Sequence, residues 1–93
     1  MPELSLLERT VQIQNRFGLH ARPAAEFVKL ANRFRSDLWV CKDDLEVNAK
    51  SIMGVMMLAA ECGATIMIRA VGDDEAAAAD ALVALVNTRF GET

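Results

Sequence analysis

Apolar and polar residues alternate along the first patterned segment of the chain. Within residues 9–14, Val11 and Ile13 are each flanked by polar residues, which is the period of two expected of a strand with one buried face. From Ala24 onward the period changes to that of a helix. The apolar stripe consists of Ala24, Phe27, Val28, Ala31 and Phe34. The pattern therefore predicts a strand over residues 9–14 and an amphipathic helix after it.

The middle of the chain has the pattern of a β-hairpin. Leu38 and Val40 begin a second strand, residues 43–44 are two aspartates suited to a turn, and Leu45 and Val47 begin the returning strand. Leu38 and Val40 face the core in this interpretation. Their neighbours Trp39 and Cys41 then lie on the more open face of the sheet.

A second helix, a last strand and a long helix complete the pattern. The second helix is predicted to start at Ser51, and residues 65–70 alternate again as a strand. Residues 72–75 supply a turn, a helix cap and early acids before an alanine-rich helix. The core-facing residues of that helix are Leu82, Val83, Val86 and Phe90. The order βαββαβα with short links predicts an α+β fold, an antiparallel sheet covered by helices on one face.

Composition narrows the class of protein. Ninety-three residues suit one domain, and a net charge of −3 gives no electrostatic reason to expect nucleic acid or an anionic membrane as partner. No apolar run approaches the roughly 20 residues of a spanning helix, and residues 1–5 lack the features of a secretory signal. Cys41 and Cys62 lie far apart, so we expect reduced thiols, a cytoplasmic location and no metal site.

The one histidine of the chain, His20, falls where the first loop becomes a helix. Pro23 suits the first helical turn, where a missing N–H costs nothing. A helix start presents unpaired amides and a positive dipole end to an anion. Arg22 adds a fixed cation suited to phosphate oxygens, and Gly18 permits a close approach of the backbone. The segment therefore predicts a site at which an imidazole carries a phosphoryl group.

Other interpretations of His20 remain open at this point. A lone histidine near a helix start is most often an ordinary surface residue. A metal site needs several ligands at suitable spacing, and no Cys-x-x-Cys pattern is present. Serine–histidine–aspartate chemistry lacks its nucleophile-elbow motif.

Methionines cluster in the predicted second helix. Val55, Leu58 and Ala59 could by themselves supply its core face, which leaves Ile52, Met53 and Met56 partly outside. Methionine generally fills irregular core gaps, but its thioether also suits an adaptable recognition surface. Ser51 is a favoured helix N-cap, and a phosphate there would add charge beside the apolar side chains.

Two motifs together resemble the HPr family of the bacterial phosphotransferase system. They are GLHARPA over residues 18–24 and NAKSIMGVM over residues 48–56, and the order of elements agrees over about residues 10–91. The resemblance implies one HPr-like domain over residues 1–93, with a core of about 9–91. It implies an open-faced β-sandwich with a four-stranded antiparallel sheet in the order 1-4-2-3 and three helices on one face. The apolar pattern alone does not separate this strand order from a ferredoxin-like one.

The resemblance also implies a phosphocarrier rather than an enzyme, with no cofactor. His20 would accept a phosphoryl group on Nδ1 from phosphorylated enzyme I and pass it to an enzyme IIA domain. Arg22 and the backbone amides after the histidine would stabilise the phosphate. The neutral imidazole is an adequate nucleophile near its reference pKa of about 6.5.

A second set of residues matches the family's regulatory and docking positions. Ser51 matches the serine modified by HPr kinase/phosphorylase in many bacteria. Phe17 stands where some members have a small polar residue that supports the active-site loop. The apolar docking patch corresponds to Ile52, Met53 and Met56, with Ala21, Arg22, Ala25, Lys29 and Lys50 around it.

Some functional alternatives stay open from the sequence. A regulatory binding module acting through Ser51 and the methionine patch is the main alternative to a carrier, and retention of His20 favours the carrier. A small enzyme is disfavoured because no paired carboxylates or Gly-rich phosphate loop accompany His20. The sugar and nitrogen-related branches of the system are not distinguished, and we expect a monomer.

Overall fold

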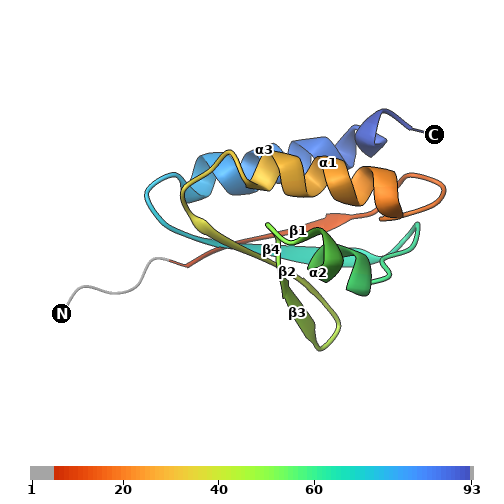
Figure 1. Cartoon of the computed structure of the whole chain (residues 1–93), viewed down its shortest axis with the longest axis horizontal. Coiled ribbons are helices and arrows are strands. Elements are labelled where there is room, and N and C mark those ends of the chain that lie inside the picture. The colour runs from red at the N-terminus through yellow and green to blue at the C-terminus, as the bar shows by residue number, and fades with distance from the viewer. Residues whose placement is uncertain (1–5, 93) are drawn as a thin grey trace.

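A four-stranded antiparallel sheet forms one layer of the computed structural model, which describes residues 6–92 (Figure 1). Its strands are β1 (Leu7–Gln12), β2 (Asp37–Lys42), β3 (Leu45–Asn48) and β4 (Thr65–Val71). They lie in the order β1-β4-β2-β3, so the last strand is inserted between the first two. This order confirms the one implied by the HPr resemblance. Residues 1–5, on which the prediction about a secretory signal rests, lie outside the described residues.

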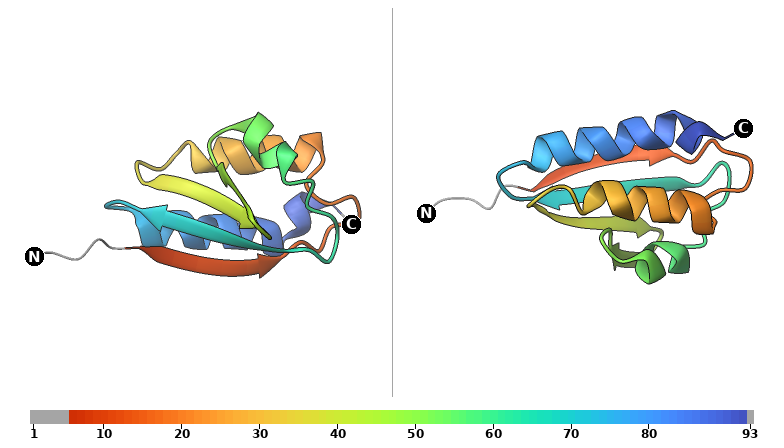
Figure 2. Two further views of the ribbon diagram at one scale, coloured as in Figure 1. Left: turned by 90° about the horizontal axis from the view of Figure 1, so that it is seen from below. Right: turned by 45° about the horizontal axis from the view of Figure 1, so that its top comes forward.

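The helices gather on one side of this sheet. Two long helices, α1 (Ala21–Ala31) and α3 (Glu75–Asn87), lie side by side across the sheet (Figure 2). The short helix α2 (Ile52–Met57) packs against α1 and β3, and a 3-10 turn, η1 (Arg89–Gly91), follows α3. The predicted open-faced arrangement with three helices is therefore confirmed.

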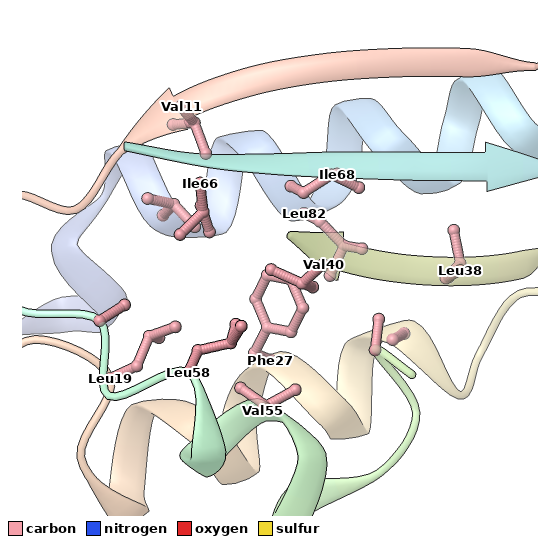
Figure 3. Close-up of a cluster of buried hydrophobic side chains, with 14 of the residues drawn as sticks. Val11, Leu19, Phe27, Leu38, Val40, Val55, Leu58, Ile66, Ile68 and Leu82 are labelled. Carbon is pink, nitrogen blue, oxygen red and sulfur yellow. The ribbon is translucent and has the colours of Figure 1, made fainter. Parts of the chain in front are cut away.

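Alternation along the strands builds the core between these layers. Ile66 and Ile68 of β4 are fully buried, and so is Val40 beside them on β2. Phe27 of α1 is fully buried and points into the space between Val40 and Val55 of α2 (Figure 3). Burying an aromatic or branched side chain of this size stabilises the fold by about 1.5–3 kcal/mol. The core fixes α1, and hence the residues that precede it, against the sheet.

The boundaries of the first strand differ from those predicted. The first strand is Leu7–Gln12 rather than residues 9–14, because Gln12 pairs with Thr65, the first residue of β4, and the Ile13 N–H bonds the Ala64 carbonyl in the loop before β4. Ile13 is nonetheless fully buried, as its apolar character indicated. Helix α1 begins at Ala21, directly after His20 and with Pro23 in its first turn, as the sequence predicted.

Asp74 occupies the N-cap position of α3, but its side chain does not cap that helix. Its carboxylate instead accepts hydrogen bonds from the Arg35 N–H, the Ser36 N–H (both 2.9 Å) and the Ser36 hydroxyl. The bond from the Ser36 hydroxyl, followed by that from Arg35, lowers the pKa of Asp74 to about 2. The side-chain cap predicted within residues 72–75 is therefore not made by Asp74, which instead links α3 to the α1–β2 loop.

The opposite face of the sheet is the more open one. Trp39 and Cys41 are half-buried there and alternate along β2 with the buried Leu38 and Val40, which confirms their predicted side. Both cysteines of the chain are free thiols, as the sequence indicated.

Candidate functional site

His20 lies at the junction between the first loop and α1. It is the N-cap residue, with extended backbone angles (φ −71°, ψ −178°), and its carbonyl accepts the first helical hydrogen bond from the Ala24 N–H at 2.9 Å. The His20 side chain makes no capping bond and is 40% exposed. The amides of Ala21 and Arg22 precede the first helical hydrogen bond, so they are available to an anion.

The loop before His20 has a conformation that requires glycine. Gly18 has φ +65°, and its N–H bonds the Asn15 carbonyl at 3.1 Å. A Cβ at Gly18 would lie 2.2 Å from the Ala60 carbonyl oxygen, so no other residue fits without moving the backbone. Leu19 is buried, and its N–H bonds the same carbonyl of Ala60 at 2.8 Å. His20 therefore extends from a backbone that is fixed on both sides.

Two side chains contact the imidazole of His20. Its Nε2 lies 3.0 Å from Oε1 of Glu92, and the Phe17 ring meets it edge-on with centroids 6.1 Å apart. Phe17 is 69% exposed, and the Arg16 guanidinium lies 5.2 Å from its ring centroid. Figure 1 shows that the end of the chain and the start of α1 meet at the same end of the molecule.

Glu92 is the site residue that sequence reasoning missed. The hydrogen bond with His20 is the largest cause of a lowered pKa at Glu92, and a bond from Asn15 and the charge of Arg22 act in the same direction against desolvation. The carboxyl is therefore ionised at neutral pH, and an ionised carboxylate can only accept hydrogen bonds. Glu92 lies 72 residues from His20, beyond the last helix, where no periodic pattern marks it.

Arg22 lies in the first turn of α1 and is exposed. Its charge is the smallest of the causes that lower the pKa of the Glu92 carboxyl, the group that contacts the His20 ring. Because His20 is the N-cap residue and α1 begins at Ala21, the prediction that His20 and Arg22 lie at the same helix start is confirmed.

The second predicted constellation lies on α2. The hydroxyl of Ser51 accepts a hydrogen bond from the Gly54 N–H at 3.2 Å, so Ser51 caps the helix as its sequence position indicated. Val55 and Leu58 are buried, whereas Ala59 is exposed with φ +48°, so its predicted place in the core is wrong. The helix has already ended at Ala59 and turns the side chain outward.

Most of the methionines on α2 are exposed. Met53 is 75% exposed and Met57 is 66% exposed, while Ile52 and Met56 are each a little over 40% exposed. These values contradict the interpretation of the cluster as core filling. The surface formed by Ile52, Met53 and Met56, here called the α2 patch, belongs to the helix that packs against α1.

The remaining predicted contact residues are distributed along α1 and before α2. Ala21 and Ala25 are exposed on α1. Lys29 is also exposed, beside a shallow groove that Leu85 of α3 helps to form. Lys50 is half-buried, and its ammonium donates to the Phe34 carbonyl at 2.8 Å, near the far end of α1.

Within residues 6–92 no group of three histidine, cysteine or acidic side chains is arranged to hold a metal ion. In the same part of the chain, none of the helices combines the length and apolar character needed to cross a bilayer.

Comparison with known proteins identifies relatives over nearly the whole chain. The family model described as "PTS HPr component phosphorylation site" matches residues 7–88. The phosphocarrier protein HPr of Neisseria meningitidis serogroup A is 48% identical over 87 residues, which are 94% of this chain and 98% of that protein.

Solved structures agree with the sequence relatives. HPr-C-His from Thermoanaerobacter tengcongensis superposes with a TM-score of 0.90 at 52% identity, covering 94% of this chain and 98% of the other. The Bacillus subtilis catabolite repression protein Crh, described as a swapped dimer, has a TM-score of 0.72 at 46% identity and covers 89% of this chain and 95% of its own.

Proposed function

This chain belongs to the HPr family, the phosphocarrier proteins of the bacterial phosphotransferase system, and we propose that His20 is the residue that carries its phosphoryl group. The hydrogen bond between Nε2 of His20 and the ionised Glu92 is the observation that carries this assignment. Because the carboxylate can only accept, Nε2 is the ring nitrogen that carries a proton, and in the neutral form of the ring Nδ1 holds the free lone pair. Nδ1 is then the nucleophile.

The transfer step follows from this arrangement. The Nδ1 lone pair of His20 forms a bond to phosphorus, and the bond from phosphorus to the donor breaks with its electron pair remaining on the donor. The Nε2 proton stays in place, and the positive charge that develops on the ring is balanced by Glu92 and by the phosphate itself. Passing the group to an acceptor reverses the same step.

The phosphate would be bound by a positively charged side chain and backbone amides at the surface rather than in a deep pocket. Arg22 and the first amides of α1 supply a guanidinium and N–H donors for its oxygens. An exposed site with few fixed donors positions the group without binding it so tightly that it cannot leave. This balance suits a relay, in which both gain and loss of the group must be rapid.

We propose enzyme I as the donor and an enzyme IIA domain as the acceptor, each docking on the α2 patch and the first turn of α1. The exposed apolar side chains of the α2 patch support this placement, because contiguous exposed apolar groups mark interaction sites. Ala21 and Ala25 would allow close approach, and Arg22, Lys29 and Lys50 would form a basic rim. Such a transient interface is expected to bury at most about 1,200 Å² in total.

Ser51 supports a second, regulatory function. Its hydroxyl caps α2 directly beside Ile52 and Met53, so a phosphate from an HPr kinase/phosphorylase would introduce charge at the docking surface. The regulatory module without carrier activity remains the alternative. A monomer in the cytoplasm remains our expectation, and light scattering would test it against a swapped dimer like that of Crh.

The decisive test is incubation with phosphoenolpyruvate and enzyme I, followed by intact-mass measurement. We expect the mass of one phosphate, lost on mild acid treatment, because a phosphorus–nitrogen bond is acid-labile. His20→Ala should abolish the gain. A modification that survives His20→Ala, or an acid-stable product, would contradict the assignment.

A further inference from the structure

Asn15 is a fully buried polar side chain next to the proposed carrier site. Its Nδ2 donates to the Gly18 carbonyl at 2.7 Å and to Oε1 of Glu92 at 3.1 Å. Its Oδ1 is buried without a hydrogen-bond partner among residues 6–92. A buried amide oxygen without a partner loses its hydrogen bonds to water and gains none in return, which destabilises the folded state. Asn15 is therefore a poor choice for stability alone, and such residues are concentrated where a site needs them.

The two hydrogen bonds of Asn15 connect the start and the end of the chain. One holds the loop that leads into His20, and the other holds the carboxylate that contacts His20 Nε2. A single oxygen of Glu92, Oε1, receives both the Asn15 amide and the imidazole. The Asn15 bond also helps to lower the pKa of Glu92, which keeps the carboxyl ionised as an acceptor.

The backbone before Glu92 brings the residue to this position, but it leaves the side chain free to rotate. Phe90 is buried and has φ +54°, a left-handed conformation that a non-glycine residue adopts at a cost. The Glu92 N–H bonds the Arg89 carbonyl at 2.8 Å and completes the turn. These contacts fix the Glu92 backbone only. Asn15 supplies the second bond that selects one direction for its carboxylate.

We propose that Asn15 is a positioning residue of the carrier reaction, which holds Glu92 so that the His20 ring presents Nδ1 with its lone pair free. This inference rests on the proposed function of His20. Asn15 acts through Glu92 and does not itself contact the phosphate. Without it, Glu92 samples other rotamers, the ring loses its fixed orientation, and the charge that develops on the ring is less well stabilised.

The test is a double-mutant cycle on Asn15→Ala and Glu92→Ala, read by the rate of phosphorylation by enzyme I. Each single variant should slow transfer roughly tenfold, because outer partners that orient a reactive imidazole have effects of at least this size. Asn15→Ala should have no further effect when Glu92 is already alanine. Gln14→Ala is the matched control, since Gln14 is the neighbouring polar residue and bonds Asn87 instead. It should transfer at the wild-type rate.

A second readout uses the unphosphorylated protein. His20 is the only histidine, so its two ring nitrogens are identified directly in a ¹⁵N NMR spectrum. The wild type should show a proton on Nε2 alone. Asn15→Ala and Glu92→Ala should both increase the fraction of the Nδ1–H form, whereas Gln14→Ala should not. A change in stability without a change in ring position would leave these shifts unaltered.

The outcomes separate this inference from the proposed function. An equal loss of rate for Asn15→Ala with and without Glu92 would mean that Asn15 only shapes the loop, and unchanged ring shifts and rates would exclude any role. A wild type that takes no phosphate on His20 would instead overturn the carrier assignment. If Asn15→Ala unfolds at the assay temperature, Asn15→Ser replaces it, because a single O–H can serve only one of the two acceptors.

Discussion

The imidazole of His20 contacts the protein on one side and solvent on the other. Its single hydrogen bond goes to Glu92, and the side chain stays 40% exposed. The Glu92 side chain is more covered, at 15% exposed, so the ring is held from the protein side and faces solvent on the other. A ring that is open on one side is compatible with the proposed role, in which one partner would add the phosphoryl group and another would remove it.

Arg22 is expected to act on the phosphoryl group and not on the fold. Arg22→Ala should slow transfer from enzyme I by on the order of tenfold, because it removes a fixed cation from the developing negative charge. The melting temperature should be unchanged, since Arg22 is exposed. Stopped-flow or quench measurement of transfer checks this. Arg33→Ala, an exposed arginine beyond the other end of α1, is the control, and equal rates for the two variants would remove the role.

Ser51 is expected to have two separable effects. Ser51→Ala loses the bond to the Gly54 N–H and should lower the free energy of unfolding by about 0.5–2 kcal/mol. Ser51→Asp and Ser51→Asn both cap helices, so denaturant unfolding should find both close to wild type. Only Ser51→Asp adds charge beside the α2 patch, and its transfer rate should be several-fold lower than that of Ser51→Asn. If the two rates agree, Ser51 is a cap and no switch.

At the scale of elements, α2 separates a buried face from an exposed one. Val55 and Leu58 anchor the helix, and Met53 at 75% exposure has no core contact to lose. Met53→Asp should therefore fold with near-wild-type stability and transfer at least several-fold more slowly, because charge replaces apolar contact at the interface. Thermal unfolding and transfer assays measure both. Leu6→Asp, an exposed apolar residue ahead of β1, controls for the loss of any surface apolar group.

Asp74 couples α3 to the α1–β2 loop in a pH-dependent way. Its pKa is about 2 in the folded protein and 3.8 as the ordinary value, so its contribution is fully present above pH 4 and is lost as pH falls toward 2. Acid unfolding of the wild type should steepen in this range, because protonation breaks the bonds to Arg35 and Ser36. Asp74→Asn should flatten the pH dependence there. Asp73→Asn is the control, and a flattening of equal size in both variants would contradict the assignment.

The whole molecule carries a net negative charge, whereas the proposed interface contains basic side chains. The net charge is −3, yet the proposed interface includes Arg22 in the first turn of α1 and Lys29 further along the same helix. Association with an acidic partner should therefore be faster at low salt, with phosphorylation slowing from about 20 to about 300 mM NaCl as screening grows. Lys29→Gln should make the phosphorylation rate depend less steeply on salt concentration. Arg9→Gln removes the same charge from β1, outside the proposed interface, and should leave the salt dependence of the rate unchanged.

Several features follow from the sequence alone because their causes are local. The alternation at Ile66 and Ile68 specifies a strand with one buried face, and the cap at Ser51 needs only the next turn of its own helix. The juxtaposition of His20 and Arg22 is equally local, since two residues separated by one position at a helix start must lie near the same amides. The two motifs around His20 and Ser51 were sufficient to identify the family.

Other features were decided only by the tertiary structure. Insertion of β4 between β1 and β2 depends on which strands pair over long separations, and the apolar period is the same in every such order. The exposure of Met53 depends on how α2 meets α1, since methionine is compatible with core and surface alike. Glu92 and Asn15 are brought to His20 by the packing of the last turn against the first loop. No local period records a hydrogen bond across 72 residues, so the sequence by itself pointed to His20 as the candidate residue, and only the fold showed that Glu92 contacts its Nε2.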